Sequence, residues 1–172
     1  MRSGTSPIRL RIAEPQSAYL ARPALVADAS VIVAALFGED GRAEALALLH
    51  GRTLHAPHLL DVEIASVGLK KLQREKLASA TVARALQAYA RLPIQRHALD
   101  AEAVVGIAAR CRLTAYDAAY LHVAEQLTAP LATLDDRLAA AAREYLAANG
   151  QVHEPDRRAI ARSRVSSAPP AG

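Results

Sequence analysis

Residues 25–33 read Leu-Val-Ala-Asp-Ala-Ser-Val-Ile-Val, and this stretch decides the fold class. The apolar residues before Asp28 predict a short buried strand, and Ser30 can start the helix that follows. An acid at the C-terminal end of a buried strand is typical of open α/β sheets, which place their functional groups there. The stretch therefore predicts an α/β protein with Asp28 near its functional site.

Short apolar segments alternate with helical patterns along the rest of the chain. We expect further strands at 53–55, 93–95 and 130–134, and a last edge strand at 151–153. Helical patterns cover 30–37, 41–50, 58–73, 79–89, 99–110, about 114–126 and 135–147. Such alternation predicts an α/β/α sandwich with a small, mainly parallel central sheet.

The chain is long enough for one domain with a tail at each end. Its 172 residues exceed the roughly 100–150 residues of a common domain, and 52% of them are hydrophobic, which is enough for a core. We expect a basic extension over residues 1–23, a folded domain over 24–153 and a disordered basic tail over 154–172. The single cysteine excludes an internal disulfide. Without a signal peptide or a membrane-spanning apolar run, we expect a cytoplasmic protein with no membrane contact.

Basic charge gathers in the tails and in one internal band. Four arginines stand against one acid in residues 1–23, and four against two acids in residues 151–172. Between Lys70 and Arg96, seven basic residues stand against only Glu75. Such a band can lie along a phosphate backbone, although two helices with solvated faces explain it equally well. An aromatic content of 3% argues against recognition of bases by stacking.

Four acids lie at the ends of predicted elements. Asp28 and Asp135 each follow a strand, Glu63 lies in an early helical turn, and Asp117 follows Thr114 with the spacing of a capping box. Each also has a purely structural interpretation: the three aspartates as helix caps, and Glu63 as a boundary residue favoured by the helix dipole. Asp136 is the second choice beside Asp135, which we favour because it directly ends the strand.

Together these acids indicate a metal site. If the element ends converge, four carboxylates raise one another's pKa values unless a cation lies among them. Mg²⁺ and Mn²⁺ prefer such oxygen ligands, and they can polarise a phosphoryl oxygen and generate hydroxide for in-line attack. The sequence therefore predicts a catalytic, metal-binding quartet, namely Asp28, Glu63, Asp117 and Asp135.

The stretches that carry these acids resemble the PIN-domain signature, and in particular the VapC-type toxins of bacterial toxin–antitoxin pairs. They are Val-Ala-Asp-Ala-Ser-Val at 26–31, Asp-Val-Glu-Ile-Ala at 61–65, Leu-Thr-Ala-Tyr-Asp-Ala-Ala-Tyr at 113–120 and Leu-Ala-Thr-Leu-Asp at 131–135. The resemblance covers about residues 24–153. The 23 residues before the first strand and the basic C-terminal tail depart from the family pattern.

The resemblance implies a PIN-like fold and a metal-dependent endoribonuclease that hydrolyses RNA phosphodiester bonds. Mg²⁺ or Mn²⁺ would be its cofactor, a second copy would form a homodimer with it, and a VapB-type antitoxin would inhibit it. Asp28 and Asp117 would be the main metal ligands, with Glu63 and Asp135 holding metal-bound waters or a second ion. Ser30 and Thr114 would be polar supports near the acids.

Two other classes of function fit parts of the pattern. A catalytically inactive PIN-like module that binds RNA or protein would keep the fold and lose metal affinity. A phosphoryl-transfer or receiver domain usually has twin acids beside its first strand, whereas Ala29 and Ser30 follow Asp28, so we rank this class low. The histidines show no zinc-like pairing, and we expect His122, five residues after Asp117, to be packed or solvated rather than a ligand.

Overall fold

The computed structural model describes residues 22–38 and 41–149 of the chain. In these residues four parallel strands form one sheet: β1 (Ala24–Ala27), β2 (Thr53–Pro57), β3 (Ile94–His97) and β4 (Leu131–Ala132). The helices are α1 (Ala29–Phe37), α2 (Arg42–Leu49), α3 (Leu59–Gln73), α4 (Ser79–Ala90), α5 (Ala101–Cys111), α6 (Ala115–Leu127) and α7 (Asp136–Ala148). The predicted α/β class with a small parallel sheet is confirmed.

The strand order β3-β2-β1-β4 locates the functional edge of the sheet. The chain proceeds outward from β1 to β2 and β3, and then returns to the opposite side of β1 to add β4, where Val26 pairs with Leu131. Beyond the strand ends, the backbone N–H of Asp28 still donates to the carbonyl of Ala132 at 2.9 Å. The point where the order reverses therefore lies between β1 and β4, and open α/β sheets bind ligands at the carboxyl ends of strands beside such a point.

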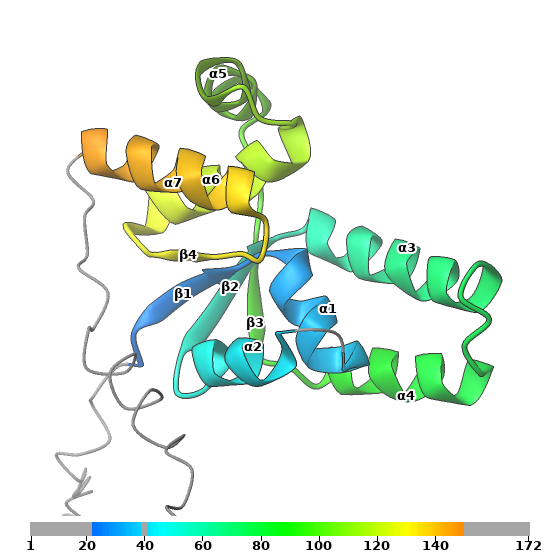
Figure 1. Ribbon diagram of the computed structural model, residues 1–172. Coiled ribbons are helices and arrows are strands. Elements are labelled where there is room, and N and C mark those ends of the chain that lie inside the picture. Colours follow the sequence, from blue (N-terminus) through cyan, green and yellow to red (C-terminus); the bar gives the residue numbers. More distant parts are fainter. Residues whose placement is uncertain (1–21, 39–40, 150–172) are drawn as a thin grey trace, which may run out of the picture.

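Helices cover both faces of the sheet, as Figure 1 shows. The α5, α6 and α7 helices lie on one side, with α6 directly against β1 and β2. On the opposite side α1 and α2 pack together, and α3 and α4 form a hairpin that extends away from the sheet. Alternate strand residues serve the two faces: Leu25 and Leu54 pack with Val31 of α1, while Val26 joins the cluster that contains Leu121 of α6. The predicted α/β/α sandwich is confirmed.

The α6 helix is the central helix of the fold. Seven consecutive residues, Ala118 to Ala124, are buried, because the sheet lies under this helix and α5 and α7 cover its flanks. The small side chains of Ala118 and Ala119, at most 1% exposed, let the helix backbone approach the sheet closely. One turn of α6 therefore projects from a rigid core toward the carboxyl edge of the sheet.

Several local features differ from what the sequence pattern favours. In α2, Ala45 is buried and Leu49 packs partly against the core, while Leu46 and Leu48 are exposed. The α4 helix begins at Ser79 without a side-chain cap. The predicted strand over 130–134 shortens to two residues, and just beyond its end the side chain of Thr133 hydrogen-bonds Asp28.

On α3, Leu60 and Ile64 are buried but Leu72 is exposed. Its neighbour Lys71 is buried instead: the ammonium group lies 5.2 Å from the centre of the Phe37 ring and donates to Glu75. The predicted edge strand at 151–153 and tail at 154–172 lie outside the described residues, as does nearly all of the predicted extension over 1–23. In the described part of the chain, every helix is too short or too polar to cross a membrane.

Candidate active site

Asp28 is both a helix cap and an acid with an unused oxygen. Its carboxylate is 8% exposed and caps α1, and all of its donors reach one oxygen, Oδ2. These donors are the hydroxyl of Ser30 at 2.5 Å, the backbone N–H of Ser30 at 3.4 Å and the hydroxyl of Thr133 at 2.9 Å. Among the described residues, no hydrogen bond reaches Oδ1. The capping interpretation and the functional interpretation of Asp28 are therefore compatible.

Two hydroxyl groups join the end of β1 to the end of β4. Ser30 Oγ accepts the backbone N–H of Leu134 at 3.0 Å, and Thr133 Oγ1 accepts the backbone N–H of Asp135 at 3.0 Å. Ser30 lies beside an acid, as expected. The contact of Thr133 with Asp28 was not predicted, although a hydroxyl residue two positions before an acid at a strand end was an available signal. These bonds hold the region around Asp135 against Asp28.

Glu63 lies at the boundary of the core because of its position on α3. Leu60, three residues earlier, and Ile64 are buried while Val62 is 68% exposed, so the Glu63 side chain is half-buried. Its Oε2 accepts a 2.5 Å hydrogen bond from the hydroxyl of Tyr120. Burial raises the pKa of Glu63, the hydrogen bond from Tyr120 opposes this effect, and the negative charges of Asp28 and Asp117 raise the pKa further. The structure thus brings three of the four acids within electrostatic reach of one another.

Asp117 forms the predicted capping pair with Thr114. The hydroxyl of Thr114 donates to Asp117 Oδ2 at 2.7 Å and accepts the backbone N–H of Asp117 at 3.1 Å. The carboxylate is half-buried, and the buried segment of α6 begins at the next residue, Ala118. A local motif therefore fixes Asp117 on the first turn of a helix whose remainder is embedded in the core.

Asp135 is the most exposed of the four acids and has the weakest connection to the other three. It is exposed and caps α7, with Oδ1 accepting the backbone N–H of Leu138 at 2.8 Å. Its connection to Asp28 runs through Thr133, and its charge is not among the causes of the Glu63 pKa shift. The choice of Asp135 over Asp136 as the fourth acid stays a prediction.

The described residues offer the ligand atoms that a hard cation prefers, but they do not form a complete coordination geometry. No three of their histidine, cysteine, aspartate or glutamate side chains are arranged to hold a metal ion as they stand. The donor set is nevertheless made of carboxylate and hydroxyl oxygens, which Mg²⁺ and Mn²⁺ prefer. Burial is the main cause of the raised pKa of Glu63, and the negative charges of Asp28 and Asp117 add a smaller effect that a cation would relieve. Asp28, Glu63 and Asp117 could therefore hold such an ion.

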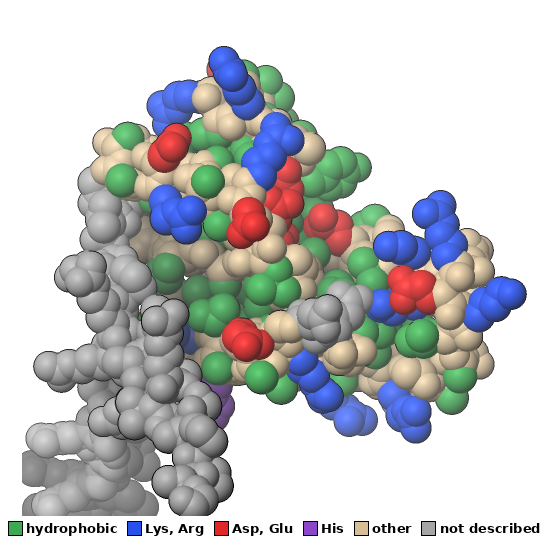
Figure 2. Space-filling view, in the orientation of Figure 1, with side chains coloured by type: hydrophobic (Ala, Val, Ile, Leu, Met, Phe, Trp, Pro, Cys, Tyr) green, Lys and Arg blue, Asp and Glu red, His purple; other side chains and the backbone are tan. Residues whose placement is uncertain are grey.

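Helix N-termini surround these acids. The α1, α6 and α7 helices begin immediately after Asp28, Thr114 and Asp135, and Glu63 lies near the start of α3. The positive ends of helix dipoles favour carboxylates and also phosphate groups. Figure 2 shows acidic side chains between the first turns of α3 and α7. The edge of the sheet thus combines fixed acids with backbone dipoles that suit an anionic substrate.

A second polar cluster holds α3 in place. Arg96 of β3 donates to Asp61 Oδ1 at 2.8 Å and to the hydroxyl of Tyr89 at 2.7 Å, and Tyr89 donates to the same Asp61 oxygen at 2.5 Å. The hydrogen bond from Arg96 is the main cause that lowers the pKa of Asp61. Asp61, two residues before Glu63, lies on a different face of α3. This cluster joins α3, α4 and β3, so it fixes the turn of α3 that carries Glu63.

Two residues of the predicted basic band are at least partly buried against structural partners. Lys71 is buried beside Phe37 and Glu75, and Arg96 belongs to the cluster with Asp61. The exposed members of the band lie on α3, in the turn after it, on α4 and directly after α4, namely Lys70, Arg74, Lys76, Arg84 and Arg91. Figure 2 shows basic side chains at the end of this hairpin, apart from the acidic region.

Three of the described histidines, His55, His97 and His122, have no hydrogen bond to Asp28, Glu63, Asp117 or Asp135. Nδ1 of His55 is 3.0 Å from Nε2 of His97, across β2 and β3. His122 is 4% exposed, and neither of its ring nitrogens has a hydrogen-bond partner among the described residues. His122 is therefore packed in the core.

Replacing Glu63 by Gln is expected to stabilise the protein in a chelating buffer. Because the pKa of Glu63 is raised in the folded state, its ionised form opposes folding above that pKa and the penalty disappears as the pH falls. We expect Tm to rise by about 2 °C at pH 7.5, and the gain to vanish near pH 4, as followed by circular dichroism. Glu44→Gln, at an exposed position of α2, should give no gain. A lower Tm for Glu63→Gln would mean that the bond from Tyr120 outweighs burial and repulsion.

Comparisons with known proteins agree with this fold. The PIN domain family model matches residues 25–144. The crystal structure of PAE2754 from Pyrobaculum aerophilum has the same fold, with a TM-score of 0.57 and 23% identity, over 76% of this chain and 88% of that one.

The relatives define the family more narrowly. Ribonuclease VapC9 of Mycobacterium tuberculosis is 44% identical over 120 residues, which cover 66% of this chain and 87% of that protein. Ribonuclease VapC3 of the same organism is 35% identical over 119 residues, which cover 68% and 86%. The chain therefore belongs to the VapC ribonucleases of the PIN-domain family, as its four acid-bearing stretches indicate.

Proposed function

We propose that the protein is a metal-dependent endoribonuclease that hydrolyses RNA phosphodiester bonds and acts as the toxin of a toxin–antitoxin pair. The observation that carries the proposal is the electrostatic coupling of Asp28, Glu63 and Asp117 at the carboxyl edge of the sheet. The relatives named as VapC ribonucleases support the same activity.

The roles of the acids follow from their hydrogen bonds. Ser30 and Thr133 hold Oδ2 of Asp28, and Thr114 holds Oδ2 of Asp117, so each carboxylate keeps its other oxygen for a cation. We propose Asp28 and Asp117 as the main ligands of Mg²⁺ or Mn²⁺, with Glu63 and Asp135 holding water or a second ion. When bound, such an ion polarises a phosphoryl oxygen and activates a water molecule. The hydroxyl groups of Ser30, Thr133 and Thr114 would hold these carboxylates in one orientation.

RNA would extend from the acids along the α3–α4 hairpin. From Glu63 to Arg74, α3 rises about 16 Å, a distance that a few nucleotides span. The exposed basic residues of the hairpin would contact phosphates, which makes binding weaken as salt rises. Because these contacts carry no base readout, they would position the RNA without selecting its sequence.

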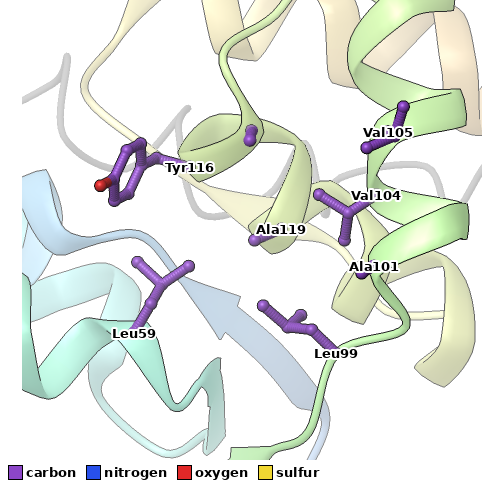
Figure 3. A pocket seen from close by; sticks show the side chains of 8 residues that line it. Leu59, Leu99, Ala101, Val104, Val105, Tyr116 and Ala119 are labelled. Carbon is purple, nitrogen blue, oxygen red and sulfur yellow. The ribbon is translucent and has the colours of Figure 1, made fainter.

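A second copy of the chain is the partner that we propose for an apolar hollow next to Asp117. The hollow has a volume of about 300 Å³, and Figure 3 shows Leu59, Leu99, Val104 and Tyr116 around it. Val105 and Tyr116 also line it and are each 64% exposed, so the hollow is part of a contiguous exposed apolar surface, which is typical of interaction sites. Light scattering tests the homodimer, because a dimer would have twice the 18.2 kDa mass of one chain. Because the chain belongs to the VapC family, we also propose a VapB-type antitoxin as its inhibitor and the cytoplasm as its location.

An RNA cleavage assay tests the proposed function directly. We expect the full chain to cut labelled RNA internally in Mg²⁺ or Mn²⁺, and EDTA to abolish the cleavage. Expression of the chain alone should arrest growth, and a cognate antitoxin should relieve the arrest. Absence of both cleavage and Mn²⁺ binding in a folded sample would favour the inactive binding module instead.

A further inference from the structure

The hydroxyl of Tyr120 is a polar group deep in the core. Tyr120 is 1% exposed and packs in the same apolar cluster as Val26 and Leu60. A hydroxyl in such surroundings needs a hydrogen-bond partner, because leaving it unpaired is costly. Its partner is the Oε2 atom of Glu63, at 2.5 Å.

The bond from Tyr120 connects parts of the fold that no local motif connects. Tyr120 lies on α6 and Glu63 lies on α3, 57 residues earlier in the chain. The backbone of Ala29, the residue that follows Asp28, lies near enough to the same hydroxyl to lower its pKa slightly, although burial and Glu63 raise that pKa far more. The Tyr120 hydroxyl therefore bonds Glu63 close to the helix start that Asp28 caps.

The α6 helix thereby contributes twice to the acidic region. Asp117 and Tyr120 are three residues apart, so they lie on neighbouring positions of one helical face. Asp117 brings a carboxylate of its own, while Tyr120 restrains a carboxylate that belongs to α3. Among the described residues, no hydrogen bond other than that from Tyr120 reaches the Glu63 carboxylate.

We propose that Tyr120 is a positioning residue for cation binding, whose hydroxyl holds Oε2 of Glu63 and leaves Oε1 available beside Asp28 and Asp117. This inference rests on the proposed metal-dependent function. Without the hydroxyl, the Glu63 side chain would be free to rotate away from the other two carboxylates, which repel it. Tyr120 would thus act through Glu63 and have no contact with the RNA.

Calorimetric titration of the full chain with Mn²⁺ tests the proposal. We expect Tyr120→Phe to weaken Mn²⁺ binding about 10-fold, the lower end of what loss of a group supporting a metal ligand produces. Tyr145→Phe is the matched control, since Tyr145 is 8% exposed and donates to Glu125 at 2.9 Å away from the acids. This control should bind Mn²⁺ within about 2-fold of the wild type. Both variants should unfold cooperatively with similar Tm values.

A double-mutant cycle separates positioning from general packing. If Tyr120 acts through Glu63, then adding Tyr120→Phe to Glu63→Gln should change Mn²⁺ affinity by less than about 2-fold, because the carboxylate it positions is absent. In RNA cleavage, Tyr120→Phe should lower kcat and leave KM for RNA within about 2-fold of the wild type.

The outcomes distinguish this inference from the proposed function. If the wild type does not bind Mn²⁺ at all, the metal-dependent function fails and the role of Tyr120 fails with it. If the wild type binds and Tyr120→Phe binds equally well, only the role of Tyr120 is overturned. The role is also overturned if Tyr120→Phe does not fold, or if it weakens binding equally in the Glu63→Gln background, since the hydroxyl would then serve packing alone.

Discussion

Asp28→Asn is expected to reduce RNA cleavage about 1,000-fold in Mg²⁺ or Mn²⁺, because it removes one of the two main carboxylate ligands that we propose. The fold should survive the change. Asparagine caps helices about as well as aspartate, and its amide oxygen can accept the bonds that Ser30 and Thr133 donate to Oδ2. The measurements are the initial rate of cleavage of a labelled RNA and the growth of cells that express the variant.

Asp100→Asn is the matched control for this prediction. Asp100 caps α5 in the same way, since its Oδ1 accepts the backbone N–H groups of Glu102 at 2.9 Å and Ala103 at 3.2 Å. It lies outside the acidic region, so the same exchange of charge should change the rate by less than about 2-fold. Full activity of a folded Asp28→Asn variant would refute a catalytic role for this carboxylate.

Leu60→Ala is expected to destabilise the protein by about 3 kcal/mol, the usual result of emptying a fully buried leucine site. Leu60 is 0% exposed and holds the first turn of α3 against the core. For a domain of this size the loss corresponds to a fall in Tm of roughly 10 °C. Thermal unfolding followed by circular dichroism measures it.

Val62→Ala in the same turn of α3 controls for helix propensity. Val62 is 68% exposed, so the truncation removes little buried surface and should change stability by no more than about 0.5 kcal/mol. Equal effects of the two substitutions would contradict the burial of Leu60 and the placement of Glu63 at the core boundary. An intermediate variant, Leu60→Met, should lose less than about 1.5 kcal/mol because its volume is similar.

Local chemistry explains which parts of the fold the sequence predicts. Asp28, Thr114 and Asp135 all cap helices in the structure, because a capping side chain bonds backbone groups two or three residues away and needs no tertiary contact. Gly38 ends α1 in a left-handed conformation, which is also a local effect because glycine adopts this conformation without strain. The alternation of apolar strands and helices then leaves few topologies open.

The features that the sequence does not predict depend on tertiary contacts between distant parts of the chain. The bonds from Tyr120 to Glu63 and from Thr133 to Asp28 span 57 and 105 residues, so no spacing rule indicates them. The exposure of Leu46 and Leu48 follows from how α2 packs, with Ala45 as its buried contact. The burial of Lys71 follows from the position of the Phe37 ring on another helix. Hydrophobic character alone does not reveal either outcome.

The pairing of the first strand with the last has a consequence for biosynthesis. Asp28 follows the first described strand, but its partners Ala132 and Thr133 are synthesised more than a hundred residues later. A nascent chain that ends before β4 therefore contains Asp28, Glu63 and Asp117 but lacks Asp135 and the residues that hold Asp28 against the end of β4. The acidic edge of the sheet is thus complete only after synthesis has passed β4.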